Sequence, residues 1–299
     1  MDMNGILNVF KPKGITSHDV VDIARRIFGI KRIGHTGTLD PNATGVLVLC
    51  IGRATRISEY LLDLDKEYVG EIRLGLATDT QDELGKVLSR SSKRVSIDEI
   101  YRAFDSFKGK IDQVPPMYSA LKHRGKKLYE IARKGGTIER KPREVEIYEL
   151  KVLNIIEAEK IIFYTRCSKG TYIRTLCDDI GEFLGTYGYM SYLMRTGVGN
   201  FQIAESHSLE YLMDLDKREL KKTVHPMDTG LTHLNAIRID DGFYRRLVNG
   251  AIIYLQEQDA KDYDINIPLR VYCNGSFIGI GRILEENMKS YLKMDKVLI

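Results

Sequence analysis

Apolar residues recur along this chain with two different spacings, and each spacing predicts one kind of secondary structure. Recurrence at helical spacing predicts helices over residues 17–28 (with Ser17 as the N-cap), 53–64, 97–107 and 171–184. Short continuous or alternating apolar runs predict strands over residues 6–10, 46–51, 68–74, 145–155 and 161–167. Because some of these strands follow one another directly, the pattern favours an α+β fold with a largely antiparallel sheet.

The pattern changes after Met227, where shorter elements begin. The pattern over residues 238–250 predicts a short helix. Over residues 270–283, apolar positions alternate on both sides of Asn274-Gly275. This dipeptide favours a two-residue hairpin turn. Strand-like pieces separated by turns fill the remaining C-terminal sequence and predict a small β-barrel. We therefore expect two domains, residues 1–230 and 231–299, although a small β extension that only supports the first domain is an alternative.

Composition adds little to this picture, but the distribution of charge adds more. The chain has 299 residues, of which 43% are hydrophobic and 29% charged, as is ordinary for a soluble globular protein. Its net charge is only +4, yet residues 108–143 contain eleven Lys and Arg against three Asp and Glu. We expect a basic arm there, with a solvated surface as the alternative. The densest basic group is Lys122, Arg124, Lys126 and Lys127.

The cysteines and the apolar runs indicate the compartment. Cys50, Cys167, Cys177 and Cys273 form no C-x-x-C pair, and the first two lie in apolar, strand-like runs. We expect buried free thiols and no zinc site. The sequence predicts neither a signal peptide nor a membrane-spanning helix. A cytoplasmic protein without membrane contact is therefore expected.

Residues 34–47 form the most distinctive segment of the chain. Its sequence, GHTGTLDPNATGVL, combines three glycines, small hydroxyl side chains and a single acid, Asp40. The end of the segment runs into the apolar run of residues 46–51. A turn-rich loop at the edge of a strand can hold a carboxylate for nucleophilic or acid–base chemistry. Such an Asp can equally cap its own backbone.

This segment resembles the signature of the TruB family of tRNA pseudouridine synthases, in which the Asp of G-H-T-G-x-L-D-P is catalytic. Five further segments resemble the family in the same order along the chain: KPKGITS (11–17), KEY (66–68), TDTQD (78–82), VPPMYSALK (114–122) and CSKGTYIRT (167–175). The resemblance is strong over residues 5–210 and weak in the C-terminal part. Phe10 departs from the pattern, because the family often has an acid before Lys-Pro, so no polar role is expected there.

The resemblance implies the pseudouridine synthase fold, with a catalytic cleft across a mixed sheet, and a PUA-like RNA-binding module at the C-terminus. It implies a stand-alone isomerase, without a required protein partner and acting as a monomer, that converts the T-loop uridine at position 55 of tRNA. It assigns stacking of a flipped base to Tyr68 and the uracil pocket to Tyr172 and Leu193. His35, five residues before Asp40, is expected either to fill the gap left by the flipped base or to contact the RNA. Lys11 is expected to support the floor of the cleft, and the basic arm to grip the tRNA.

The chemistry of this reaction agrees with the residues present. Converting uridine to pseudouridine breaks a C–N bond and forms a C–C bond on the same sugar, so it needs neither a redox step nor a group donor. The sequence contains no phosphate-binding loop, dinucleotide fingerprint or metal-ligand cluster, and we expect no cofactor and no metal. Asp40 is the candidate nucleophile or base. Arg174 is expected to pair with Asp40 and keep it ionised, and to hold Asp82, rather than Asp79, as a second acid.

Three alternative functions are considered. The first is a non-catalytic RNA-binding or RNA-folding module on the same scaffold, against which the intact set of Asp40, Tyr68 and Arg174 argues. The second is a guide-RNA-dependent synthase of the related ribonucleoprotein type, against which residues 89–110 and the short C-terminal part argue. The third is an aspartyl-phosphate phosphotransferase, because residues 36–39 are similar to part of a D-x-T-G-T-L motif. Gly34 stands where that motif has its nucleophile.

Overall fold

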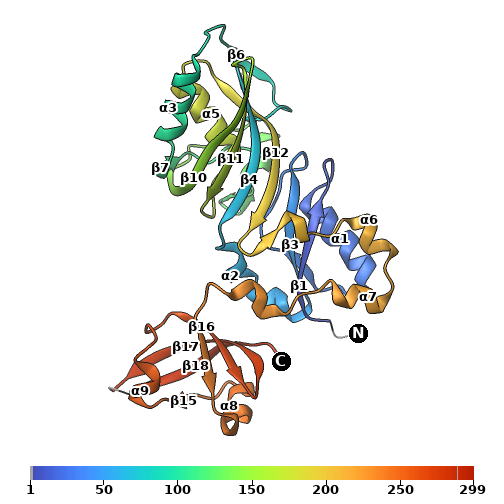
Figure 1. Cartoon of the computed structure of the whole chain (residues 1–299), viewed down its shortest axis with the longest axis vertical. Coiled ribbons are helices and arrows are strands. Elements are labelled where there is room, and N and C mark those ends of the chain that lie inside the picture. Colours follow the sequence, from blue (N-terminus) through green and yellow to red (C-terminus); the bar gives the residue numbers. More distant parts are fainter. Residues whose placement is uncertain (1–2, 288) are drawn as a thin grey trace.

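The computed structural model describes residues 3–287 and 289–299, and within them a nine-stranded sheet forms the larger part of the molecule (Figure 1). Its order is β1-β3-β12-β4-β11-β10-β7, with β2 paired to β3 and β13 to β12. The strands are β1 (Gly5–Lys11), β2 (Ile33–His35), β3 (Thr44–Ile51), β4 (Lys66–Leu74), β7 (Gly109–Gln113), β10 (Arg143–Ile156), β11 (Lys160–Cys167), β12 (Gly188–Val198) and β13 (Phe201–Gln202). Among the described strands of this sheet only β3 and β12 pair in parallel, so the expected mixed, largely antiparallel sheet is confirmed.

The half of the sheet that contains β1 and β3 is covered on both faces. Leu47 and Leu49 belong to a core with helices α1 (Ser17–Phe28), α6 (Leu209–Asp214) and α7 (Lys217–Lys222). Val48 and Cys50 point to the opposite side, where η1 (Gly52–Ile57) and α2 (Ser58–Leu62) pack. Because successive side chains of a strand alternate between faces, burial of both faces explains why β3 is apolar throughout.

Two predictions for this half need correction. The N-cap of α1 is Thr16, which forms a capping box with Asp19, and Ser17 is the first helical residue. The single helix expected over residues 53–64 is instead a 3-10 turn, η1, followed by the short α2. The Lys66 ammonium donates hydrogen bonds to the carbonyls of Leu62 and Leu64, which satisfies carbonyls that the end of α2 leaves without helical partners.

The other half packs one face against α3 (Ile97–Ser106) and α5 (Ile173–Phe183). Phe104 of α3 meets Phe163 of β11 edge to face, with 6.0 Å between the ring centroids. A capping box between Ser96 and Glu99 starts α3 close to the predicted residue. The predicted pairing of β10 with β11 is confirmed as an antiparallel hairpin.

The two halves meet where β3 and β12 run side by side for two residue pairs, Thr44–Met194 and Gly45–Arg195. This parallel contact begins just after the Asp40 loop. Gly45 has a φ of 105°, and a Cβ there would lie 2.1 Å from the Arg195 carbonyl oxygen. Only glycine permits this approach, so the junction that positions the loop depends on it.

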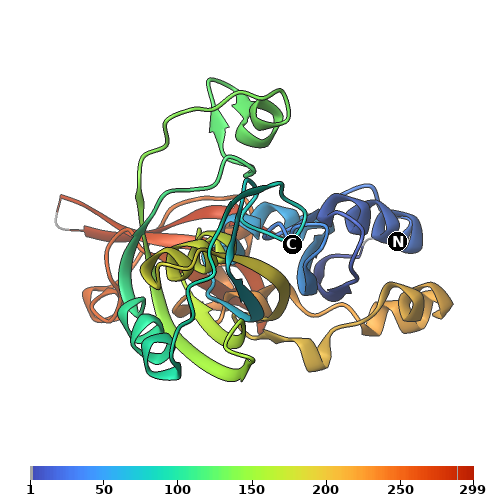
Figure 2. The same cartoon turned by 90° about the horizontal axis from the view of Figure 1, so that it is seen from above.

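Residues 114–142 leave the sheet between β7 and β10 and form a projecting arm (Figure 2). It contains a small hairpin, β8 (Lys122–His123) and β9 (Lys126–Lys127), and helix α4 (Leu128–Ala132). The predicted arm began at residue 108 and ended at 143. Gln113 and Arg143 instead pair with each other at the sheet edge, so both ends of that range belong to the sheet. A second small hairpin, β5 (Leu76–Thr78) and β6 (Val87–Arg90), follows β4.

The described C-terminal residues form a five-stranded sheet of order β14-β16-β17-β18-β15. Its elements are β14 (Ala236–Ile239), η4 (Asp241–Phe243), α8 (Tyr244–Val248), β15 (Ile253–Tyr254), α9 (Glu257–Ala260), β16 (Pro268–Cys273), β17 (Ser276–Glu286) and β18 (Lys289–Val297). Asn274 and Gly275 both have positive φ, 53° and 67°, between β16 and β17, so the predicted hairpin is confirmed. The helix expected over residues 238–250 is wrong in its first part, because β14 pairs with β16 there.

This C-terminal module packs against the first part of the chain through η1, α2 and η3 (Met227–Leu231). Ile280 and Leu298 join a core with Ile57. The hydroxyl of Tyr272 donates a hydrogen bond to Asp228 at 2.6 Å. The interface is therefore partly apolar and partly specific, and it ties the module to the strand layer that carries the loop. Within the described chain, no helix combines the length and apolarity needed to cross a membrane.

Candidate active site

The loop that carries Asp40 connects β2 to β3, and a buried lysine holds it from below. Lys11 is completely buried, and its ammonium donates hydrogen bonds to the carbonyls of Pro12 (2.9 Å), Pro41 (3.1 Å) and Ala43 (2.8 Å). Burial lowers the pKa of Lys11 to about 8, while the nearby Asp40 acts in the opposite direction. All three N–H donors of the Lys11 ammonium are engaged by backbone carbonyls. Lys11 therefore supports the loop and does not present its ammonium to the space above the loop.

Two further buried side chains fix the same loop. The Ser17 hydroxyl accepts a hydrogen bond from the Leu39 N–H at 2.8 Å and donates one to the Leu39 carbonyl at 3.1 Å. The Arg195 guanidinium donates to the carbonyls of Val46 (2.7 Å) and Gly37 (3.0 Å). The sequence did not single out Arg195; its only signal is a lone charge within the buried stretch of β12. The loop is thus held at several backbone positions by residues from three different elements.

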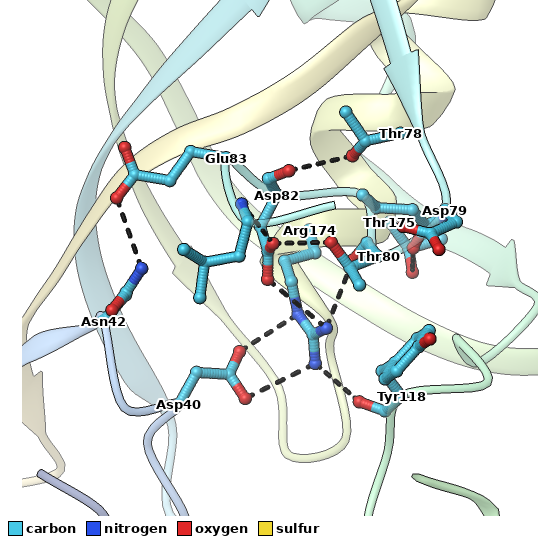
Figure 3. Close-up of polar contacts among 12 residues, drawn as sticks. Asp40, Asn42, Thr78, Asp79, Thr80, Asp82, Glu83, Tyr118, Arg174 and Thr175 are labelled. Atoms are coloured by element: carbon cyan, nitrogen blue, oxygen red, sulfur yellow. Dashed lines mark hydrogen bonds and ion pairs between the residues drawn. The ribbon is translucent and has the colours of Figure 1, made fainter. Parts of the chain in front are cut away.

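Asp40 and Arg174 form a two-pronged ion pair (Figure 3). Arg174 Nε lies 3.0 Å from Asp40 Oδ2, and Nη2 lies 3.4 Å from Oδ1. The Arg174 side chain is 7% exposed, whereas that of Asp40 is 38% exposed. The predicted pair is confirmed, with the arginine buried beneath a carboxylate that remains accessible.

Arg174 also holds the second acid that the sequence suggested. Its Nη1 lies 3.7 Å from Asp82 Oδ2 and donates to the Thr80 carbonyl at 3.2 Å. Thr80 in turn donates its hydroxyl proton to Asp82 Oδ1 at 2.6 Å. Asp79 instead accepts a hydrogen bond from the Lys86 N–H. Asp82 is therefore the acid at the site, as expected, and Asp79 stabilises its own turn.

The remaining contact of Arg174 leads to the arm. Nη2 donates to the Tyr118 carbonyl at 2.8 Å, at the base of the projecting segment. All three guanidinium nitrogens thus have acceptors, which restrains the orientation of the side chain (Figure 3). A planar guanidinium with this set of contacts can present two parallel donors to one carboxylate.

The protonation of Asp40 is set by opposing effects. Desolvation raises the pKa of its carboxyl, Arg174 lowers it, Asp82 raises it and Lys11 lowers it. The net direction is upward from the ordinary value of 3.8, so burial outweighs the arginine. As expected, Arg174 lowers the pKa of Asp40, but this effect is smaller than the rise that desolvation causes. A carboxylate with a raised pKa is a stronger base than an ordinary Asp.

Tyr68 and Leu193 lie together beside the loop. Tyr68 of β4 is 8% exposed and Leu193 of β12 is 7% exposed, and both belong to a core cluster with Leu39 and Ala43 of the Asp40 loop. Burial raises the pKa of the Tyr68 hydroxyl, and Arg195 acts in the opposite direction. The structure thus brings a tyrosine ring and an aliphatic side chain into one apolar cluster with residues on either side of Asp40 in the loop.

Of the other two predicted residues, Tyr172 lies close enough to Arg174 and Asp40 for their charges to affect its pKa, whereas His35 contacts the Gly37 N–H of the Asp40 loop. Tyr172 immediately precedes α5, where its N–H donates to Gln113 Oε1 at 3.0 Å, and burial raises the pKa of its hydroxyl. His35, at the end of β2, is half-buried. Burial and then Arg195 lower the pKa of its imidazole from 6.5, so His35 is neutral at pH 7.

The four basic residues lie in the small β8–β9 hairpin of the arm, which projects from the rest of the chain (Figure 2). Lys122, Arg124 and Lys126 are exposed, and the ammonium of Lys127 lies 5.4 Å from the centre of the Tyr129 ring. Arg124 and Gly125 have positive φ and form the hairpin turn. The arm therefore presents its charges to solvent, connected to the site by its base at Tyr118.

The cysteines are as expected, free and buried, at Cys50, Cys167, Cys177 and Cys273. Burial raises the pKa of the Cys50 and Cys167 thiols to about 12. Over the described residues, no group of three or more His, Cys, Asp or Glu side chains is arranged to hold a metal ion.

Comparison with known proteins agrees with the motifs. Residues 25–173 match the model of the TruB family pseudouridylate synthase N-terminal domain, and residues 174–232 match that of the tRNA pseudouridylate synthase B C-terminal domain. A tRNA pseudouridine synthase B of Alkaliphilus oremlandii is 45% identical over 99% of both chains. One of Clostridioides difficile is 41% identical over 99% of this chain and all of the relative.

Solved structures share the fold. In the crystal structure of a Cbf5–Nop10–Gar1 complex, one chain superimposes with a TM-score of 0.77 at 27% identity, over 99% of this chain and 85% of that chain. In a structure of an H/ACA RNP bound to a substrate RNA containing 2′-deoxyuridine, the TM-score is 0.75 at 25% identity, with the same coverage. The similarity extends through the C-terminal module, which lies beyond both family models.

Proposed function

The chain belongs to the TruB family of pseudouridylate synthases, and on this basis we propose a substrate and a role for each residue of the site. The protein is an isomerase that converts a uridine of tRNA into pseudouridine. We assign uridine 55 of the T-loop as that residue, as the sequence motifs imply. The observation that carries the proposed site is the accessible Asp40 carboxylate held in two-pronged contact by the buried Arg174.

Asp40 is the catalytic carboxylate in this proposal. The reaction breaks the bond between N1 of uracil and C1′ of ribose, turns the base, and joins C5 to C1′; C5 then loses its proton and N1 gains one. Asp40 starts the reaction as a nucleophile at C1′ or as a base at C2′, and both routes need its unprotonated form. Arg174 orients the carboxylate, and Lys11, Ser17 and Arg195 hold the loop in place.

The base reaches Asp40 only if it leaves the RNA stack. Extrusion of a base costs a few kcal/mol, and contact with an aromatic ring offsets part of that cost. Tyr68 is the proposed stacking partner, and Leu193 and Tyr172 line the uracil pocket. The neutral His35 contacts the RNA at the position that the flipped base has left. Asp82 contributes a second carboxylate to the site through its contact with Arg174.

Binding of the tRNA is assigned to two separate surfaces. The exposed arm residues Lys122, Arg124 and Lys126, together with the half-buried Lys127, contact phosphates, which supplies affinity that depends on salt. Residues 231–299 act as a PUA-like RNA-binding domain, separate from the catalytic domain of residues 1–230. Both would extend the contact beyond the T-loop.

We further propose that the enzyme acts in the cytoplasm as a monomer, without a guide RNA, a protein partner or a cofactor. The complexes with Nop10 and Gar1 belong to structural neighbours at 27% identity. The relatives at 41–45% identity cover nearly the whole chain and are named as tRNA pseudouridine synthases. The greater similarity to the second group supports stand-alone action.

One assay tests this function directly. The purified protein is incubated with an unmodified tRNA transcript, without guide RNA or other proteins, and pseudouridine is mapped along the RNA. We expect quantitative conversion at position 55. Binding and refolding of tRNA without any pseudouridine would favour the RNA-folding alternative, and conversion only after addition of a guide RNA would favour the ribonucleoprotein type.

A further inference from the structure

The loop that supplies Asp82 contains a residue in an unusual backbone conformation. Gln81, between Thr80 and Asp82, has a φ of 61°. Residues other than glycine rarely adopt this left-handed region, because the Cβ crowds the following carbonyl oxygen. Both neighbours of Gln81 contact Arg174, so the conformation of Gln81 determines where those contacts fall.

The side chain of Gln81 is held at both ends by α5. Thr175 donates its hydroxyl proton to Gln81 Oε1 at 3.0 Å, and Gln81 Nε2 donates to Asp178 Oδ2 at 2.6 Å. Thr175 and Asp178 are three residues apart and therefore lie on one face of the helix. Thr175 directly follows Arg174, so one helix orients both the arginine and the loop that brings Asp82 to it (Figure 3).

Backbone hydrogen bonds hold the loop around Gln81 to its own turn and to β12. The Gln81 N–H donates to the Thr78 carbonyl at 3.1 Å, the Gln81 carbonyl accepts from the Met190 N–H at 3.0 Å, and the Glu83 N–H donates to the Met190 carbonyl at 3.1 Å. None of these bonds connects the loop to α5. Besides Arg174 itself, the amide of Gln81 supplies that connection, with one acceptor and one donor matched to one hydroxyl and one carboxylate.

We propose that Gln81 and Asp178 form a positioning clamp that holds the Thr80–Asp82 backbone in register with Arg174, and thereby sets the orientation of Arg174 toward Asp40. The two residues act through Arg174 and do not touch the substrate. This role in catalysis rests on the proposed pseudouridine synthase function, whereas the clamp itself is a property of the fold.

The first experiment compares single-turnover rates on tRNA at saturating enzyme. Asp178→Ala leaves Gln81 Nε2 without its acceptor, and we expect the rate to fall about tenfold while tRNA affinity stays within about twofold. Asp178→Asn keeps an oxygen that accepts the same hydrogen bond, and should retain most of the rate. Asp179→Ala, which removes the neighbouring acid of the same helix, is the matched control and should leave the rate unchanged.

The second experiment uses the backbone of Gln81. Glycine adopts a φ of 61° without strain, so Gln81→Gly should be several-fold more active than Gln81→Ala, although both lack the amide. Asp178→Ala added to Gln81→Gly should cost less than twofold more, because the partner is already absent. A full additional tenfold loss in this double variant would show that Asp178 acts independently of Gln81 and would overturn the clamp.

A third measurement does not depend on activity. Amide hydrogen exchange of residues 78–86 should be faster in Asp178→Ala than in wild type and Asp179→Ala. If wild type makes no pseudouridine, the proposed function fails while the exchange data still test the clamp. If wild type is active, and Asp178→Ala matches Asp179→Ala in both rate and exchange, the clamp is refuted and the function stands.

Discussion

At the scale of single residues, the site is a compromise between access and burial. Asp40 remains partly exposed, as the proposed contact with a substrate requires, while Arg174 lies beneath it with all three guanidinium nitrogens engaged. Desolvation raises the pKa of Asp40, and Arg174 limits that rise. The pair thus provides a carboxylate that is more basic than usual and fixed in direction.

Replacing Asp40 with Asn should abolish conversion and leave tRNA binding nearly unchanged. The amide keeps the size of the side chain but supplies neither a nucleophile nor a base. We expect the single-turnover rate to fall by far more than tenfold, since a tenfold loss corresponds to only about 1.4 kcal/mol of barrier. Residual conversion within tenfold of wild type would show that another group performs the chemistry.

Replacing Arg174 with Lys separates charge from geometry. Lysine keeps the positive charge but cannot contact both oxygens of Asp40, Asp82 and two backbone carbonyls from one planar group. A large loss of single-turnover rate is expected, with only a small change in melting temperature. Equal rates for the variant and wild type would mean that the charge alone suffices.

At the scale of elements, two features place the site: the short parallel contact of β3 with β12, and α5. The first brings the Asp40 loop next to Tyr68 and Leu193, and the second supplies Arg174. Each feature carries a structural cost that experiments can measure. The contact requires a glycine, and α5 keeps acids in partly buried positions.

Two glycines of the motif should respond differently to alanine. A Cβ at Gly45 would lie 2.1 Å from the Arg195 carbonyl oxygen, at a φ of 105°. Gly45→Ala should therefore lower the free energy of unfolding by about 3 kcal/mol or more. Gly34→Ala, where the added methyl group meets nothing within 4 Å, should change it little. Urea titrations of the two variants test this, and equal losses would contradict the account of the junction.

Asp179 of α5 should reduce stability at neutral and alkaline pH. Burial raises its pKa to about 7 from 3.8, and Asp178 and Glu182 add to the shift. As the pH rises between these values, the unfolded chain loses the proton first, so the free energy of unfolding falls through this window. Asp179→Asn should raise the melting temperature at pH 8 and have little effect at pH 4. Asp262→Asn, at an exposed position, is the control, and an equal effect at both pH values would contradict the assignment.

At the scale of the whole molecule, the proposed function assigns binding and chemistry to different parts. The Asp40 site lies where the two halves of the large sheet meet, while the basic arm projects from the sheet and the C-terminal module packs against its other end (Figures 1 and 2). A long, bent substrate such as tRNA can contact all three. Affinity should therefore be separable from turnover.

Removal of the arm charges tests that separation. Changing Lys122, Arg124, Lys126 and Lys127 together to Ala should weaken binding of any tRNA and flatten the plot of log K against log salt by about 0.7–0.9 per lost phosphate contact. Turnover at saturating tRNA should fall less than affinity. The matched control removes four exposed charges of α7, Lys217, Arg218, Lys221 and Lys222. Filter-binding titrations between low and moderate salt measure this slope for the wild type and both variants. An unchanged slope of log K against log salt in the arm variant would remove the arm from the RNA interface.

The sequence alone determined the features that depend on neighbouring residues. The spacing of apolar positions located several longer elements, such as α1, α3, α5, β1, β3 and β4, and Asn274-Gly275 located a hairpin, because both follow from local backbone preferences. It predicted neither β12, which pairs with both β3 and β4, nor most of the short elements. The motifs also singled out Asp40, Arg174 and Asp82, which the structure brings into contact. Their residue types at these positions are those that the proposed chemistry requires, so they were candidates before their contacts were known.

Only the tertiary structure decided which distant groups meet. Arg195 bonds to carbonyls 149 and 158 positions away, and no local period encodes such partners. Thr16 and Ser17 are both good capping residues, but the Ser17 hydroxyl is engaged by Leu39 of the Asp40 loop, and Thr16 takes the cap. The net direction of the Asp40 pKa likewise depends on how much water the folded chain removes. Packing, which brings remote segments together, settles these points.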